Sequence, residues 1–255
     1  MAEPTGRPGE LSLTALAVAA DPDPAPLYRP TGPLTGHRPD TRLLAALAAR
    51  LRGPDAGAPL AAAPDRAHLA DLAAAALAAL GPVPDGTGLL LVQPGHDTDH
   101  DAFPLPRLVH DAPWRVGEDL ALSHPEDSGG LDVFDLLRWW LPPGGRTALV
   151  LADRPEFAGR DGAPPTGTVL ALLVTAGPGT LTVLPGPVDG PALRCAAPTA
   201  AVAWLALARA LADGALPPGG TAELAVPTAA RTARLALRAD GVLRPRTVTV
   251  ERSAP

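Results

Sequence analysis

Short apolar runs alternate with helical periodicities along most of the chain. The first run, Leu11–Ala19, has the length of a strand and ends at the Asp-Pro-Asp-Pro breaker of residues 21–24. Gly88–Gln93 and Arg146–Ala152 are almost continuously apolar, which is typical of strands buried on both faces of a parallel sheet. The other predicted strands are Glu118–Ser123, Thr168–Ala176, Thr180–Leu184, Thr221–Val226, Ala233–Ala239 and Thr247–Glu251.

Apolar residues at helical spacing predict helices between several of these strands. In one of the helices, Leu69, Leu72, Ala76, Leu77 and Leu80 share a face. The chain therefore alternates between strand and helix in its first part, which is the pattern of a layered α/β fold. The predicted helices run from Asp40 or Thr41 to Leu51, from Asp65 to Leu80, and over Phe103–Asp111, Leu131–Leu141 and Thr199–Ala212.

Glycine and proline mark the breaks in this pattern. The Gly-Pro-Gly of residues 177–179 lies between two predicted strands and is a hairpin signal, so we expect these strands to be an antiparallel pair at a sheet edge. Residues 21–39 are rich in proline and predict an irregular loop. Trp139 and Trp140 are expected to seal the end of their helix against the sheet and a partner.

Composition narrows the class of protein. The chain has 255 residues, of which 46% are apolar and only 3% aromatic, so small aliphatic side chains must fill its core. A net charge of −6, with both signs spread along the chain, does not favour nucleic acid. No segment approaches the roughly 18 apolar residues of a membrane span, and the first residues lack a basic start. We therefore expect a cytoplasmic protein without membrane or nucleic-acid partners.

Metal and cofactor chemistry have little support in the sequence. A single cysteine, Cys195, excludes an internal disulfide and a multi-cysteine metal site, and a free cysteine is most often a small buried residue. His96 and His100 lie among three aspartates in residues 95–101 and could bind a divalent metal. The Pro94-Gly95 start of this segment does not allow the helical register that would put both histidines on one face, so we expect a solvated loop. No glycine-rich phosphate loop opens a helix, and no cofactor is predicted.

Several sequence segments follow one another in an order that resembles the order found in the thiolase superfamily, in particular in beta-ketoacyl-ACP synthase III. They are the Ala-rich helix of residues 65–80, GLLLVQ and the loop after it, the Ser-Gly-Gly turn before LDVFDLL, the strands of residues 168–184, and the small-residue helix after CAAPT. The resemblance implies a layered αβαβα fold, with a thiolase-like half over residues 1–186 and a shortened half over residues 187–255. A strand and helix that the family has in its second half are missing near residues 185–193.

The resemblance also implies that the chemistry of the family is lost. Family members transfer an acyl group from a thioester to a cysteine and then condense it with a malonyl unit, using a Cys, a His and an Asn. A thiolate suits this role because a helix N-terminus stabilises it and its thioester is exchangeable. Here Asp127 stands at the Cys of the Cys-x-Gly-Gly turn, where a carboxylate would give an over-reactive mixed anhydride. Residues 185–193 contain no His, and Arg194 or Cys195 stands where the family has Asn.

The resulting hypothesis is a catalytically degenerate subunit in fatty acid or polyketide biosynthesis. It is expected to pair with an active ketosynthase homologue, or with itself as a dimer, through the edge strand that the family uses, and to meet acyl carrier protein or acyl-CoA. One alternative is a divergent acyltransferase or hydrolase that uses Ser128, with His124 as its base, or Cys195. Asp127 and Ser128 are also good N-cap residues. The other alternative is a binding module for acyl chains or small molecules.

Overall fold

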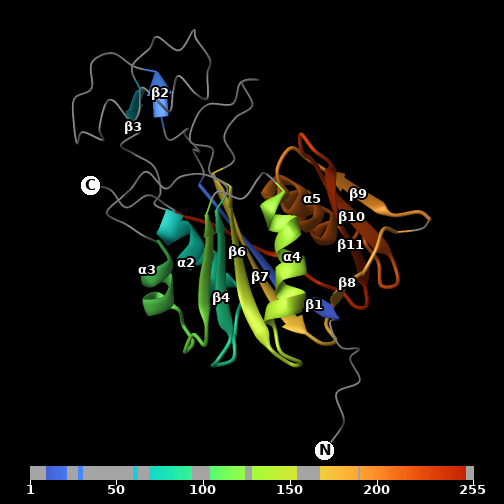
Figure 1. Cartoon of the computed structure of the whole chain (residues 1–255), viewed down its shortest axis with the longest axis horizontal. Coiled ribbons are helices and arrows are strands. Elements are labelled where there is room, and N and C mark those ends of the chain that lie inside the picture. Colours follow the sequence, from blue (N-terminus) through green and yellow to red (C-terminus); the bar gives the residue numbers. More distant parts are fainter. Residues whose placement is uncertain are drawn as a thin grey trace, which may run out of the picture.

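The computed structural model describes residues 10–21, 28–30, 60–62, 69–93, 104–123, 128–153, 167–188 and 190–250. They form a large mixed sheet flanked by helices and a separate two-stranded sheet of residues 28–30 and 60–62 (Figure 1). The helices are α2 (Leu69–Ala79), α3 (Pro104–Asp111), α4 (Gly129–Trp140) and α5 (Ala200–Ala212). The strands are β1 (Leu11–Ala20), β2 (Tyr28–Pro30), β3 (Leu60–Ala62), β4 (Gly88–Gln93), β5 (Asp119–Ser123), β6 (Arg146–Asp153), β7 (Thr168–Ala176), β8 (Leu181–Val183), β9 (Leu193–Ala196), β10 (Thr221–Pro227), β11 (Thr232–Ala239) and β12 (Arg246–Thr249).

The strand order reveals two related halves. The main sheet runs β5-β4-β6-β7-β1-β8-β11-β10-β9, and β12 adds a parallel strand to the end of β1. In the first half, β5, β4 and β6 are parallel, and β7 is antiparallel to both β6 and β1. In the second half, β9 and β10 are parallel, and β11 is antiparallel to both β10 and β8. The second half therefore repeats the first with its outermost strand missing, within the part of the chain described.

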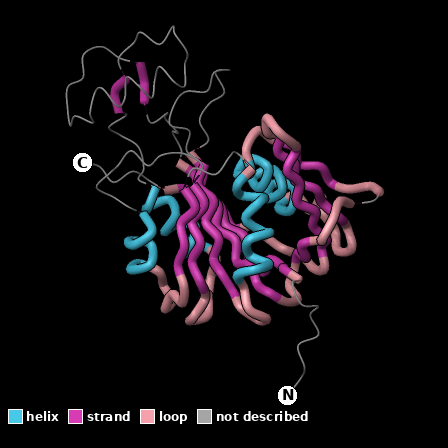
Figure 2. Tube along the Cα trace, viewed as in Figure 1, coloured by secondary structure: helices cyan, strands magenta, loops and turns pink. Residues whose placement is uncertain are grey.

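Helices cover both faces of the first half of the sheet, as the continuous apolar runs predicted. In Figure 1, α2 and α3 lie on one side of these strands, and α4 and α5 lie on the other, between them and the second half. Side chains of β1 alternate between two cores: Leu16 and Val18 join the core around α4 and α5, and Ala17 and Ala19 face α2. The small side chains let α2 approach the sheet closely, and Figure 2 shows the resulting layers.

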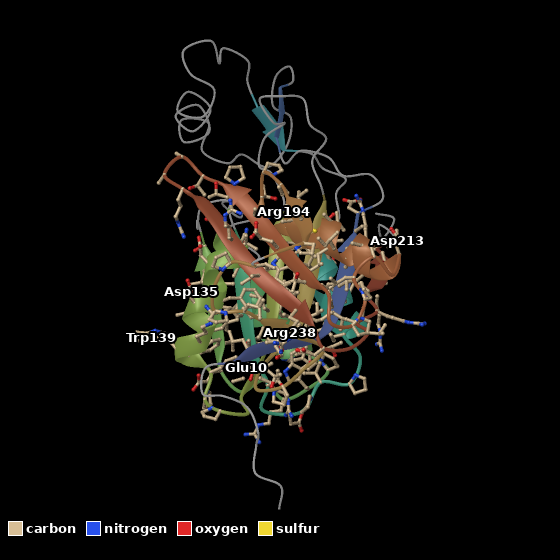
Figure 3. All side chains as sticks on the ribbon, turned by 90° about the vertical axis from the view of Figure 1, so that its right-hand side faces the viewer. Glu10, Asp135, Trp139, Arg194, Asp213 and Arg238 are labelled. Atoms are coloured by element: carbon tan, nitrogen blue, oxygen red, sulfur yellow. The ribbon has the colours of Figure 1, made fainter. Side chains whose placement is uncertain are left out.

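The outer face of the second half is polar instead. In the part of the chain that the structure describes, no helix packs there, and β11 alternates exposed Thr232, Arg234 and Arg238 with buried alanines and leucines. The buried carboxylate of Glu223 on β10 binds Arg194 of β9 at 3.0 Å and also binds Arg234. Arg194 and Arg238 are labelled on this face in Figure 3. The missing outer layer is thus compensated by a cross-strand ladder of charged side chains.

The predicted hairpin at residues 177–179 is wrong. Strands β7 and β8 do not pair with each other, because β1 lies between them and pairs antiparallel with both. The turn carries the chain across β1: Gly177 N donates to Glu10 O, and Thr180 N donates to Leu13 O. A Cβ on Gly179 would lie 2.6 Å from Ser12 Cβ. The glycines are therefore needed for a close crossing, and β7 is a central strand rather than an edge strand.

Other predictions from the sequence have mixed outcomes. The described strands and helices lie within a few residues of the predicted ranges, but β9 and the antiparallel pair β2–β3 were not predicted. The predicted helix of residues 40–51 and most of the proline-rich stretch are outside the described residues. Trp139 does not seal the helix, because its side chain is 93% exposed. Trp140 does pack at the end of α4, and its Nε1 donates to Glu118.

None of the described helices is both long and apolar enough to cross a bilayer.

The division of the chain into a thiolase-like half that ends at residue 186 and a shortened half that follows it stays a prediction.

Glu223 offers a test of the charged ladder. We expect Glu223→Ala to lower the free energy of unfolding by about 1.5–3 kcal/mol, because two charge-assisted hydrogen bonds are lost. Replacing Arg194 and Arg234 together by methionine should cost more, about 3–5 kcal/mol, because it leaves a buried carboxylate unpaired. Urea unfolding measures both, with exposed Asp135→Asn as the control. A Glu223→Ala variant as stable as that control would contradict the ladder.

Candidate functional site

The first turns of α4 and α5 meet between the two halves of the sheet. A Cβ on Gly130 in α4 would lie 2.9 Å from Ala200 Cβ in α5 and 3.2 Å from Leu151 Cδ2 in β6. The indole Nε1 of Trp204 donates to Gly130 O at 3.2 Å, and Thr199 caps α5 by accepting from Val202 N. Two helix N-termini, each the positive end of a helix dipole, therefore converge on one place.

Ser128 stands immediately before α4 and is only 1% exposed. It occupies the N-cap position, as predicted, but its side chain makes no capping hydrogen bond. Instead, Ser128 Oγ donates to Asp132 Oδ2, one helical turn further on, at 2.7 Å. The serine hydroxyl is thus oriented by a carboxylate and does not cap the N-terminus of α4.

Asp132 also binds the second half of the chain. Its Oδ1 accepts from Arg231 Nη2 at 2.6 Å, and the two side chains are 37% and 62% exposed. Arg231 belongs to the tight turn between β10 and β11, in which Thr228 N donates to Arg231 O and Arg231 N donates to Thr228 Oγ1. A chain of hydrogen bonds therefore runs from the buried hydroxyl of Ser128 through a carboxylate to an arginine at the surface.

Sequence reasoning missed both Asp132 and Arg231. The spacing of four residues between Ser128 and Asp132 is a local signal, because side chains four apart share a helix face. Arg231 carries no local signal, since it is 99 residues from its partner.

Cys195 lies on β9 with its side chain turned into the core around α5. Burial raises the pKa of the Cys195 thiol above its ordinary value. A reactive cysteine needs the opposite shift, which comes from nearby positive charge. This environment fits a small core residue and does not favour a thiolate nucleophile at neutral pH.

The remaining predicted site residues, Asp127, His124, His96 and His100, lie outside the described residues. Their roles stay predictions. Among the residues that are described, no three His, Cys, Asp or Glu side chains gather as a metal site.

The sequence offers few candidates for the Cys, His and Asn that ketoacyl synthase III enzymes use. The chain contains no asparagine, its only cysteine is Cys195, and no histidine follows His124. The second half therefore offers neither an imidazole nor a side-chain amide from asparagine to the place where α4 and α5 meet.

Comparison with solved structures identifies the fold. The chain is similar to ChlB3, described as an acyltransferase, with a TM-score of 0.58 and 14% identity over 92% of this chain and 98% of that one. It is similar to 3-oxoacyl-(acyl carrier protein) synthase III from Pseudomonas aeruginosa PAO1, with a TM-score of 0.53 and 16% identity over 91% and 99% of the two chains. A third is PksG, an HMG-CoA synthase from Bacillus subtilis, with a TM-score of 0.57 and 11% identity over 90% and 80%.

No protein-family model and no curated protein sequence matches the chain. The structural matches establish a thiolase-like α/β fold of the ketoacyl synthase III type, as the sequence resemblance implied. At this level of identity they establish the fold alone.

The contact between α4 and α5 can be tested at Gly130. Gly130→Ala should lower the free energy of unfolding by about 1–3 kcal/mol, because the added methyl forces the two helices apart. Gly186→Ala is the matched control, since a Cβ there meets nothing within 4 Å and should change stability by less than about 0.5 kcal/mol. Equal stability of the two variants in urea unfolding would contradict the close contact.

The burial of Cys195 predicts a difference between wild type and Cys195→Ala that depends on pH. Because the folded thiol has a raised pKa, it holds its proton longer than the unfolded chain does, whose thiol titrates near pH 8.5. The cysteine's contribution to stability is therefore complete below that pH and is lost as the pH rises through the folded pKa. Urea unfolding between neutral and alkaline pH should show wild type losing stability relative to Cys195→Ala. A constant difference would mean that the thiol is solvated.

Proposed function

We propose that this protein is a thiolase-fold subunit that does not form carbon-carbon bonds and works as the partner of a ketosynthase homologue or of a second copy of itself. The observation that carries the proposal is chemical: the chain has no asparagine, no histidine after His124, and a single cysteine in the core. Decarboxylative condensation needs a thiolate and groups that stabilise the enolate, and these residues do not supply them. Fatty acid or polyketide assembly is the setting that the fold suggests, by analogy alone.

The edge strand β5 supports the partner role. Leu89 N donates to Glu118 O, so the backbone of Glu118 faces β4. Because alternate residues of a strand bond to the same neighbour, Leu120 and Leu122 also face β4. Ala121 therefore turns its backbone N–H and C=O outward. The strand has no lysine, proline or bulge of the kind that protects free edges. The C-terminal end of α4, whose Trp140 Nε1 donates to Glu118 just before β5, also exposes Trp139 at 93% and Leu136 at 37%. An open edge with an exposed tryptophan nearby favours pairing with another chain.

The opposite edge of the sheet serves as a control surface. Strand β9 is short and bracketed by Pro191 and Pro198. Ala197 N donates to Ala225 O, so Ala196, like Arg194, turns its N–H away from β10.

The partner surface is tested by two matched substitutions to proline. Ala121→Pro removes one outward N–H from β5 and should abolish association, while Ala196→Pro removes one from β9 and should leave it intact. Light scattering after size-exclusion chromatography, with co-purification from the native host, measures association. If Ala121→Pro associates as wild type does, or wild type is always a lone monomer, the partner role through β5 is wrong.

A second candidate function is acyl transfer or acyl-thioester hydrolysis through Ser128. The hydrogen bond from Ser128 Oγ to Asp132 favours it, because a serine oriented by a carboxylate has a proton acceptor at hand. Ser128 also stands at the tip of α4, where the positive end of the helix dipole stabilises developing negative charge. The substrate class in this case is an acyl thioester, such as acyl-CoA or an acylated carrier protein. Acyl-thioester binding without transfer would instead support a binding module.

A further inference from the structure

We propose that Asp132 is the base that takes the hydroxyl proton of Ser128 when an acyl group is transferred, and that Arg231 is the positioning residue that holds Asp132. This inference rests on the acyl-transfer function put forward above for Ser128. It replaces His124 by Asp132 as the partner of the serine.

The geometry of Ser128 meets the first requirement. A serine hydroxyl is a weak nucleophile until a base removes its proton, and that base must lie within about 2.6–3.2 Å. Asp132 Oδ2 lies 2.7 Å from Ser128 Oγ and already accepts its proton in a hydrogen bond. The oxygen lone pairs of the hydroxyl are thereby directed away from Asp132.

Arg231 and Ser128 bind different oxygens of the Asp132 carboxylate. Its Nη2 binds Oδ1 at 2.6 Å, which leaves Oδ2 to the serine. The arginine comes from a turn closed by hydrogen bonds between Thr228 and Arg231, so its backbone is fixed. A charged donor held in this way fixes the rotation of the carboxylate, as the third member of a catalytic triad fixes its base.

The position of the three residues also bears on access to Ser128. The hydroxyl is buried, but Asp132 and Arg231 are 37% and 62% exposed, so Ser128 lies one contact behind a surface ion pair. An exposed pair of this kind contributes only about 0.2–1 kcal/mol. The role of Arg231 requires this pair to stay closed during acyl transfer, so the substrate must reach Ser128 beside the pair rather than through it.

Acyl transfer begins with the hydroxyl of Ser128. Ser128 Oγ attacks the carbonyl carbon of the thioester, and its proton passes to Asp132 Oδ2. The positive end of α4 stabilises the tetrahedral oxyanion. The carbon-sulfur bond then breaks, the thiolate leaves with the proton from Asp132 as a free thiol, and an acyl ester remains on Ser128. Attack by water or by an acceptor alcohol or amine releases the acyl group.

Intact mass spectrometry of the full chain incubated with acetyl-CoA or hexanoyl-CoA tests the proposal. Wild type should gain one acyl group, and Ser128→Ala should gain none. Asp132→Asn should slow the gain by about 100-fold, since general-base catalysis is worth at least that much. Asp135→Asn, on the exposed side of the same helix, should acylate at the wild-type rate.

Two further variants separate chemistry from structure. Arg231→Lys should retain most of the acylation rate and Arg231→Met should lose it, at equal thermal midpoints, because only a cation at this place holds Oδ1. In a Ser128→Cys background, Asp132→Asn should have a smaller effect, since a thiol is a stronger nucleophile than a hydroxyl and depends less on a base. If Asp132→Asn does not fold, the pair of Arg231 variants decides.

The outcomes distinguish the inference from the function on which it rests. Absence of an adduct on wild type, while Ser128→Cys is acylated, would overturn acyl transfer by Ser128 and the inference with it. An adduct on wild type that forms equally fast in Asp132→Asn would leave the function standing and overturn the role of Asp132. Equal rates in Arg231→Lys and Arg231→Met would overturn the role of Arg231.

Discussion

The close contact between the first turns of α4 and α5 is the constraint on which the rest of this structure depends. Gly130 faces Ala200 at a distance that admits no additional methyl, and Trp204 closes the contact with a hydrogen bond to Gly130 O. Because α4 belongs to the first half and α5 to the second, this contact joins the halves on the inner side of the sheet, in addition to the pairing of β1 with β8. It also places Ser128 beneath the turn that carries Arg231.

The shortened second half retains this arrangement with fewer elements. Its described strands keep the parallel and antiparallel relations of the first half, but the outermost strand and the outer helices are missing. An uncovered sheet must have a polar outer face, and Glu223 with its two arginines supplies one. The inner face is unchanged, since the second-half strands still bury alanine, leucine and valine against α5. The described second half therefore keeps its central helix α5 although it has fewer strands than the first half.

The sequence predicted those parts of the fold that depend on local pattern. Apolar runs located β4, β6 and β10, and the helical periodicity of α5 was apparent. Thr199, the first residue of that predicted helix, is its N-cap in the structure. Long-range pairing was not predictable in the same way. The Gly-Pro-Gly after β7 has the residues of a hairpin, yet the competing ladders with β1 separate β7 from β8. The Asp132–Arg231 pair was missed for the same reason, since no local pattern indicates a contact between residues so distant in the chain.

The central claim is that this protein does not make carbon-carbon bonds, and condensation activity can be measured directly. The purified chain would be incubated with hexanoyl-CoA and radiolabelled malonyl-CoA, alone and with an active ketosynthase of the same host. We predict no β-ketoacyl product and no release of carbon dioxide from the chain alone. A β-ketoacyl product formed by the chain alone, and lost when Ser128 or Cys195 is replaced by alanine, would contradict the account.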